Sequence, residues 1–224
     1  MKRSLVLLVL VYAVFAHQPR IVEGSGIVEI TNPQISQAFY GELNGSPAVF
    51  EIKSDAPFEL YVGITVPAIE GARIDKSVEV TSLDAGGKEK RILFLNASGE
   101  WRPFHEEFAG DDYFQGPETR MNASAGTYRI TVSSPGNAGK YALAVGEEEV
   151  FGPGETINAV VLLPKLKSWF FGKSPFEALF TKVYLFAFLP VFAIVAVLAL
   201  GTWAIRTFIL RKPAKIGRKR GSRA

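Results

Sequence analysis

Residues 58–66 read FELYVGITV, and this stretch decides the fold class of the chain. Every second residue is large and apolar, namely Phe58, Leu60, Val62, Ile64 and Val66. Alternate side chains of an extended strand point to opposite faces, so these side chains share one face. The stretch therefore predicts a β-strand that packs one face against a core.

Two stretches further along the chain show the same alternation. Residues 127–133 and 140–145 each place three apolar side chains on one face. The link between them, SPGNAG at 134–139, is rich in turn-forming residues. We therefore expect these two strands to pair as a hairpin.

Weaker strand patterns fit five other stretches, at 26–30, 35–42, 48–53, 77–83 and 90–96. About eight short strands separated by turn residues are typical of an antiparallel sandwich or jelly roll. Roughly 120 residues can bury such a core without disulfides. We therefore expect an all-β domain over residues 26–146, preceded by a linker at 17–25.

Residues 183–205 contain no charged residue. At about 1.5 Å per residue, a helix of this length crosses a hydrocarbon core of about 30 Å. A buried helix of a soluble protein would carry polar residues on one face, and this stretch has almost none. Tyr184 and Trp203 lie near its two ends, where aromatic rings prefer the membrane interface, and such helices tolerate Pro190. We expect one C-terminal transmembrane α-helix.

The N-terminus has the pattern of a secretory signal peptide. Residues 1–16 begin with a basic pair, continue as an apolar run and end with Val14 and Ala16, small residues suited to cleavage before His17. The run is short for a membrane crossing, and an uncleaved anchor is the alternative. Residues 206–224 hold eight basic and no acidic residues, which favours a cytoplasmic tail. Both ends predict a single-pass protein of the cell membrane with an extracellular N-terminal domain.

Charge is unevenly distributed along the chain. The whole sequence has a net charge of +3 and a pI near 9.0, whereas residues 17–150 hold 11 basic and 20 acidic residues, a net charge of −9. The basic pI therefore reflects topology, and we expect no nucleic-acid partner. The tail at 211–224 either only marks the cytoplasmic side or also attracts anionic lipids.

Residues 147–174 form a juxtamembrane connector. Its stretch INAVVLLPKLKSWFFGK, at 157–173, mixes apolar and aromatic residues with three lysines. This composition suits a segment that lies in the lipid headgroup region, and a final strand followed by an ordinary linker is the alternative. Residues 174–177 match a helix capping box, so we expect one helix over 175–210 that contains the span at 183–205.

Residues 101–119, WRPFHEEFAGDDYFQGPET, combine aromatic rings with acids in a predicted long loop. One interpretation is a binding surface for a sugar, a basic partner or calcium, and the other is a loop that only covers the end of the core. Calcium would bind through the two adjacent aspartates, but no EF-hand spacing is present. The candidate ligand-binding residues are Trp101, Phe104, Tyr113, Asp111 and Asp112.

Motifs for catalysis are absent from the sequence. The chain has no cysteine and only two histidines, His17 and His105. It lacks G-x-S-x-G, the phosphate-binding glycine motifs and HExxH. We expect no enzymatic activity, no metal and no cofactor. Three N-x-[ST] sequons, at Asn44, Asn96 and Asn122, are possible glycosylation sites on the exported side.

Two stretches resemble a known family of domains. Residues 125–146, AGTYRITVSSPGNAGKYALAVG, look like the closing hairpin of bacterial and archaeal pre-peptidase C-terminal-type β-sandwich domains. Residues 35–67 are similar to the opening strands of those domains, with an F-E-I strand followed by alternating apolar residues. The layout also resembles that of uncharacterised prokaryotic single-pass membrane proteins. The resemblance implies a non-catalytic appended module, although this chain has no peptidase domain, and no functional residue carries over.

These features together predict a non-catalytic, membrane-anchored surface protein whose extracellular β-sandwich binds a protein or a glycan. The alternative is a structural or accessory subunit of a membrane protein complex, with contacts made by residues 183–205 and 157–171. The expected partners are therefore the lipid bilayer, an extracellular protein or glycan and, in the alternative, a membrane protein.

Overall fold

The computed structural model describes residues 17–209, so the predicted signal peptide and the tail at 211–224 lie outside the described residues. The chain divides into two compact units, which meet in sequence between Leu185 and Phe186. The first unit holds all the described strands and the helices that precede the apolar helix.

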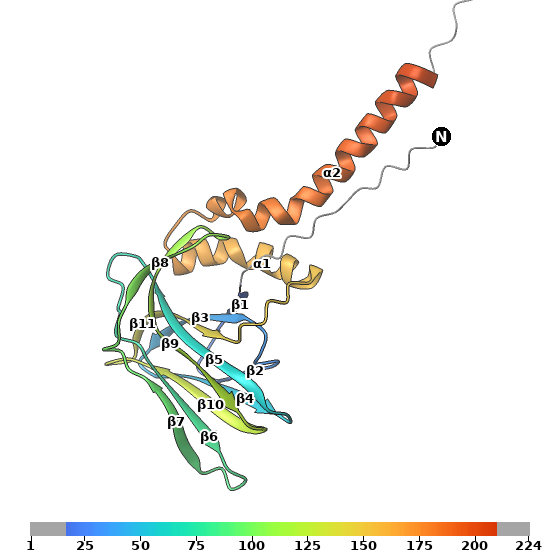
Figure 1. Cartoon of the computed structure of the whole chain (residues 1–224). Helices are drawn as coiled ribbons and strands as arrows, with labels where there is room; N and C mark the ends of the chain where they lie inside the picture. Colours follow the sequence, from blue (N-terminus) through green and yellow to red (C-terminus); the bar gives the residue numbers. More distant parts are fainter. Residues whose placement is uncertain (1–16, 210–224) are drawn as a thin grey trace, which may run out of the picture. The chain divides into compact units, whose positions relative to one another are not determined.

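Two β-sheets form the body of the first unit (Figure 1). The six-stranded sheet has the order β1 (Gln18–Ile21), β3 (Gln37–Asn44), β11 (Ala138–Val145), β5 (Phe58–Pro67), β9 (Asp111–Ala123) and β8 (Arg102–Glu106). The five-stranded sheet has the order β2 (Ile27–Ile30), β4 (Ala48–Ser54), β10 (Gly126–Ser133), β6 (Ser77–Leu83) and β7 (Glu89–Leu95). Neighbouring strands are antiparallel except for the parallel pairs β1–β3 and β2–β4.

The two sheets pack face to face around one apolar core, which makes the domain a β-sandwich. The apolar face predicted from residues 58–66 lies in this core, and both Leu60 and Val62 are 0% exposed. Aromatic rings join the sheets, with Phe39 5.4 Å from Phe50 between ring centroids. Each buried side chain of this size stabilises the fold by about 1.5–3 kcal/mol relative to exposure.

All eight predicted strands are present, with ends that differ from the prediction by at most two residues. Three further strands, β1, β8 and β9, were not predicted. The first of them lies in the expected linker at 17–25, where four residues pair with β3 in the register Gln18 to Gln37. A strand of four residues is too short for its alternation to stand out in the sequence.

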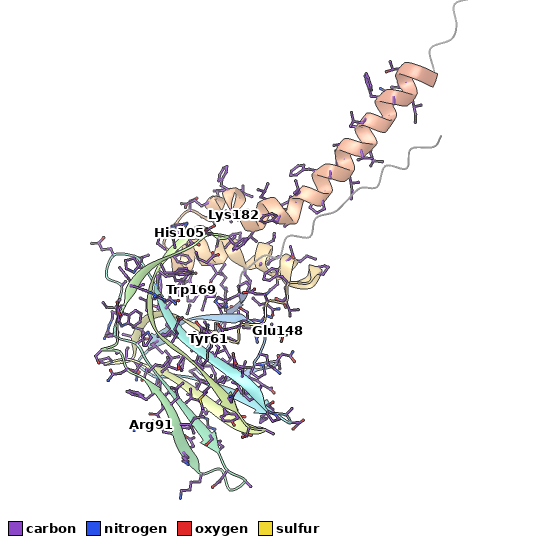
Figure 2. All side chains as sticks on the ribbon, in the orientation of Figure 1. Tyr61, Arg91, His105, Glu148, Trp169 and Lys182 are labelled. Atoms are coloured by element: carbon purple, nitrogen blue, oxygen red, sulfur yellow. The ribbon has the colours of Figure 1, made fainter. Side chains whose placement is uncertain are left out.

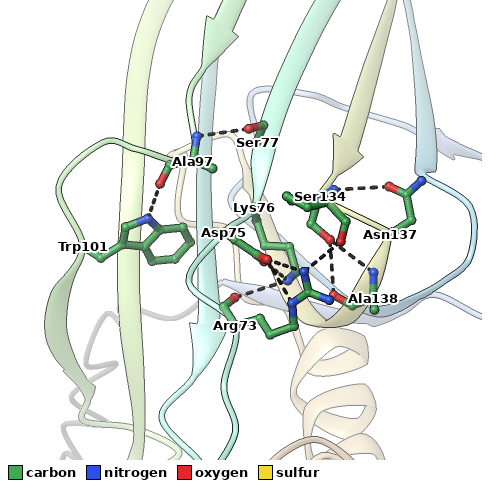
Figure 3. Close-up of polar contacts among 10 residues, drawn as sticks. Arg73, Asp75, Lys76, Ser77, Ala97, Trp101, Ser134, Asn137 and Ala138 are labelled. Atoms are coloured by element: carbon green, nitrogen blue, oxygen red, sulfur yellow. Dashed lines mark hydrogen bonds and ion pairs between the residues drawn. The ribbon is translucent and has the colours of Figure 1, made fainter.

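The predicted hairpin between 127–133 and 140–145 does not form. Its first strand, β10, pairs with β4 and β6, whereas its second strand, β11, pairs with β3 and β5 in the other sheet. The link between them therefore crosses from one sheet to the other. Arg73 donates a hydrogen bond of 2.8 Å to the Pro135 carbonyl oxygen, and Ser134 bonds to Asn137 and Ala138 within the link (Figure 3). Both strands bury their apolar faces in the core, but from opposite sides.

The expected connector at 147–174 is largely helical, and the final strand of the alternative interpretation does not form in it. It contains α1 (Pro153–Lys165) and the π-helix η1 (Leu166–Phe170). The 3₁₀-helix η2 (Pro175–Phe180) follows it, and we call residues 153–180 the helical cover. The helix expected over 175–210 is interrupted at Thr181, which is extended. The Thr181 hydroxyl accepts a hydrogen bond of 3.3 Å from the Tyr184 backbone N–H, so this residue caps a new helix.

That new helix, α2 (Lys182–Ala204), continues into the π-helix η3 (Ile205–Ile209). By length and composition it is long and apolar enough to cross a membrane. None of its side chains is buried within the described structure.

Candidate ligand-binding site

The predicted loop at 101–119 is a β-hairpin made by β8 and β9. Phe104 lies opposite Tyr113 and His105 lies opposite Asp112 in the antiparallel register. The Glu106 carboxylate closes the turn by accepting hydrogen bonds of 2.8 and 2.7 Å from the backbone N–H groups of Phe108 and Ala109. The hairpin projects its residues alternately to two faces, which separates the candidate residues.

Trp101 lies outside the candidate site and packs against the sandwich core. Its indole N–H donates a hydrogen bond of 2.9 Å to the Ala97 carbonyl oxygen (Figure 3). The indole ring also covers Gly116, where an added Cβ would approach the ring to 2.7 Å. Trp101 therefore has the covering role that the second interpretation of the loop predicts.

Asp111 and Asp112 point in opposite directions. The Asp112 side chain is 61% exposed and lies 2.7 Å from His105 Nδ1. The Asp111 side chain is 0% exposed, and its Oδ1 atom accepts from Lys167 Nζ at 2.8 Å and from Lys173 Nζ at 2.9 Å. Calcium binding by these two aspartates together is therefore incompatible with the structure. Within residues 17–209, no three His, Asp or Glu side chains form a group suited to a metal ion.

A pocket of about 90 Å³ lies on the outer face of the six-stranded sheet, and we call it the outer-face pocket. Short residues on the central strands leave the space, namely Ala38, Gly63, Thr65, Ala142 and Ala144. Aromatic rings line it at Tyr40, Tyr61, Phe104 and Tyr113. Polar groups come from His17, Glu106, Gln115 and Glu118. Of the five candidate residues, the structure brings Phe104 and Tyr113 together here and leaves the other three outside.

Hydrogen bonds fix the tyrosine rings of the pocket. The hydroxyl groups of Tyr40 and Tyr113 lie 3.1 Å apart, and Tyr61 donates a hydrogen bond of 2.7 Å to Glu118. Gln115 donates a second hydrogen bond of 2.7 Å to the same carboxylate oxygen. Burial raises the pKa of all three tyrosines, so their hydroxyl groups stay neutral at physiological pH.

The Glu106 carboxyl group of the pocket has a perturbed pKa. Burial raises its pKa above the ordinary value, because the charged form loses solvation, and the negative charge of Asp111 adds to the effect. The hydrogen bonds that Glu106 accepts from the backbone N–H groups of Phe108 and Ala109 oppose this shift. Glu118, the other carboxylate of the pocket, accepts hydrogen bonds from Tyr61 and Gln115 and pairs with Arg102 at 3.6 Å.

The helical cover packs against two tyrosines that line the pocket, Tyr40 and Tyr113. Phe170 packs edge-on against Tyr40 at 5.0 Å between ring centroids, and Phe171 does so against Tyr113 at 5.2 Å. Lys140 of β11 donates hydrogen bonds to the carbonyl oxygens of Trp169 and Phe170 at 2.6 and 3.3 Å. Figure 2 labels Trp169 on the cover. The aromatic residues expected to face lipid thus face the sheet.

One serine–histidine pair lies near the pocket. Ser36 Oγ is 2.5 Å from His17 Nδ1, but Ser36 is 1% exposed, so a substrate could not reach its oxygen. His105, the other histidine, is an exposed side chain paired with Asp112. The structure therefore does not place the Ser36 hydroxyl as an accessible nucleophile beside His17.

The three sequon asparagines are all exposed. Asn44 ends β3, Asn96 follows β7 and Asn122 lies on β9. A glycan could be attached at each position without entering the core. Their glycosylation stays a prediction.

Known proteins resemble the chain only distantly. No protein-family model matches the sequence, and no curated protein matches it. Among solved structures it is similar to the pre-peptidase C-terminal domain of collagenase from Bacillus anthracis, with 12% identity and a TM-score of 0.35 over 56% of this chain and 97% of that one. CorA, a surface-associated copper-binding protein of Methylomicrobium album BG8, gives 10% identity and a TM-score of 0.29 over 58% and 100%. A β-glucosidase from Paenibacillus barengoltzii gives 11% identity and a TM-score of 0.24, and the match covers 57% of this chain and 13% of that one. At such values no ligand or activity carries over.

The sequence contains an indication of the outer-face pocket that the alternation of apolar residues does not reveal. The polar-side positions of β5 include Tyr61 and Gly63, and those of β11 include Ala142 and Ala144 as well as Lys140. At the first four of these positions, small residues and a tyrosine replace the charged residues that a solvent-facing strand normally carries. Such positions indicate a sheet face that is covered or that binds a ligand.

Proposed function

We propose that the chain is a non-catalytic, membrane-anchored surface protein whose β-sandwich binds a protein or a glycan in the outer-face pocket. The observation that carries this proposal is the pocket itself, which combines four aromatic rings with hydrogen-bonding groups on a sheet face. Aromatic rings supply contact area to sugars and to peptide side chains, and the polar groups orient them.

Charge narrows the class of ligand. The lining residues include Glu106 and Glu118 but no lysine or arginine. Anionic ligands would meet these two carboxylates, and Arg102, which pairs with Glu118 at 3.6 Å, lies outside the lining. A neutral sugar or a basic peptide side chain therefore fits the pocket better than a phosphate or a carboxylate.

The membrane anchor in this proposal is α2. It has 23 residues, of which only the first, Lys182, is charged, and its length matches the thickness of a bilayer. The predicted signal peptide would export the sandwich, and the basic residues after the span would stay in the cytoplasm.

Binding can be tested with the full-length protein in lipid nanodiscs, screened against a glycan array and cell-envelope extracts. Phe104→Ala removes an exposed ring of the pocket, whereas Phe94→Ala removes a ring of similar exposure on β7 in the other sheet (42% and 46% exposed). We expect Phe104→Ala to weaken capture of the recovered ligand at least fivefold and Phe94→Ala to leave it unchanged. Equal effects of both variants, or no ligand at all, would contradict the proposal.

An accessory subunit of a membrane complex is the second candidate. It is favoured by the exposed apolar side chains along α2, among them Val191, Ile194 and Leu198, which are 53%, 61% and 64% exposed. Co-purification in mild detergent tests this candidate. The natural protein is compared with a variant in which a generic transmembrane span of equal length replaces α2. A partner that is lost only with the generic span supports this candidate.

A further inference from the structure

The short helix η2 exposes an unusual amount of apolar surface. Three of its six residues are large and apolar and point away from the protein: Phe176 is 73% exposed, Leu179 57% and Phe180 88%. Isolated exposed apolar residues are ordinary, but three in one short helix form a patch. This patch consists of Phe176, Leu179 and Phe180, and we call it the η2 patch.

Contacts on both sides hold η2 in place. Before it, Lys173 pairs with the buried Asp111 at 2.9 Å. Within it, Ala178 is 1% exposed, and its carbonyl oxygen accepts a hydrogen bond of 2.7 Å from the Thr181 hydroxyl. After it, Lys182 pairs with Glu107 at 2.7 Å. The outward direction of the patch is therefore a consequence of how the cover is fixed to the sandwich.

The sequence places this patch directly before the apolar helix. Phe180 is three residues from Val183, the first residue of the uncharged stretch. Three residues span at most about 11 Å, and the headgroup region on one side of a bilayer is about 5–8 Å deep. If α2 spans the membrane, as the proposed function states, Phe180 lies in the headgroup region or within a few ångströms of it.

We infer that the η2 patch inserts into the headgroup region of the outer leaflet, so that the β-sandwich rests on the bilayer surface. This inference rests on the membrane anchor of the proposed function. It also changes the role of the connector, because Phe170 and Phe171 pack on the sheet and η2 supplies the lipid-facing side chains instead. Apolar burial drives the insertion, and aromatic rings are favoured at this depth.

The chain contains no cysteine, which makes site-specific spin labelling direct. Single-cysteine variants Phe180→Cys and Leu179→Cys would be labelled with a nitroxide in the full-length protein, reconstituted in phosphatidylcholine nanodiscs. Power saturation compares collisions of the label with oxygen, which concentrates in lipid, and with a water-soluble nickel chelate. We expect both labels to collide with oxygen at least threefold more, relative to nickel, than a label in water.

Two matched labels separate the possible failures. Phe94→Cys on β7 provides the water reference, and Ile194→Cys within α2 reports whether the anchor is in lipid. If Ile194→Cys is in lipid while both η2 labels resemble Phe94→Cys, the η2 inference is overturned and the anchor stands. If Ile194→Cys is in water, the proposed anchor itself fails. Labels on η2 that meet neither reagent would show a protein contact, which also overturns the inference.

Discussion

Asp111 connects the sandwich to the helical cover at a single buried atom. Its Oδ1 accepts from Lys167 and Lys173, while within the described structure its Oδ2 has no hydrogen-bond partner. Lys167 is 2% exposed, so loss of the carboxylate charge would leave a buried ammonium group uncompensated. We expect Asp111→Asn to lower the free energy of unfolding by about 3–5 kcal/mol. Chemical denaturation of the full-length protein in detergent measures this change.

Asp112→Asn is the matched control, since it alters the next residue in the same strand. Its side chain is exposed and pairs with His105 at the surface, so the expected cost is under about 1 kcal/mol. If the two variants lose similar stability, the Asp111 cluster does not hold the cover in the way described here.

Glu106 gives the pocket a pH dependence with a definite sign. Because its pKa is higher in the folded chain than the ordinary 4.5, the folded state binds more protons than the unfolded state between these two values. The free energy of unfolding should therefore fall as pH rises through this window. Glu106→Gln cannot titrate, so the wild type should lose stability relative to this variant on going from pH 4.5 toward neutrality.

Thermal unfolding of both proteins at several pH values measures the difference. The comparison uses the slope with pH and not the absolute stability, because the glutamine also loses one of the two acceptors that close the turn. A difference that stays constant with pH would show that burial does not perturb Glu106.

Individual residues also show how much of the site the sequence could predict. Composition alone identified the 101–119 stretch, and two of its five candidates, Phe104 and Tyr113, line the pocket. Asp111 and Asp112 are adjacent in sequence and so suggest a joint calcium site, but neighbours in a strand face opposite sides. The partners of Asp111 lie 56 and 62 residues further along the chain, a distance that no local pattern can bridge.

At the scale of elements, the alternation of apolar and polar residues predicts a strand only where the buried positions are apolar and the exposed positions are polar. β10 is such a case, with Tyr128, Ile130 and Val132 buried. In β9 the buried Asp111 is charged, and the buried glycine at 116 falls on the opposite parity, because the pairing register shifts between Gly63 and Thr65 of β5. The sequence of β9 therefore shows no regular apolar alternation. Pairing is harder still, because a turn between two strands has the same composition whether it closes a hairpin or crosses between sheets.

The helical cover should depend on the Phe170 ring. Phe170 is 0% exposed and contacts Tyr40, Trp169 and Phe171. We expect Phe170→Ala to cost about 3–5 kcal/mol through lost burial and a cavity. Hydrogen exchange should show faster exchange in α1 and η1, while β4, β10 and β6 keep their protection, since these strands lie in the other sheet.

Ile157→Ala in α1 serves as the control for that prediction. Its side chain is 65% exposed, so the expected change is within about 0.5 kcal/mol. Uniformly faster exchange in both sheets of Phe170→Ala would mean that the cover and the sandwich unfold as one cooperative unit.

At the scale of the whole molecule, the separation of charge predicts the topology. Residues 17–150 carry a net charge of −9, whereas residues 206–224 carry eight basic residues and no acid. Positive residues that flank a span are retained in the cytoplasm. The cysteine-free chain allows this to be tested with Asp55→Cys in the exposed turn before β5 and Ser222→Cys in the tail.

A membrane-impermeant maleimide applied to intact cells distinguishes the two sides. We expect Asp55→Cys to react at once and Ser222→Cys to react only after the membrane is permeabilised, because α2 separates the two positions. Reaction of Ser222→Cys alone in intact cells would reverse the orientation. Reaction of both without permeabilisation would show that α2 does not span, and the outer-face pocket would then have to be explained in a protein that is not anchored by this helix.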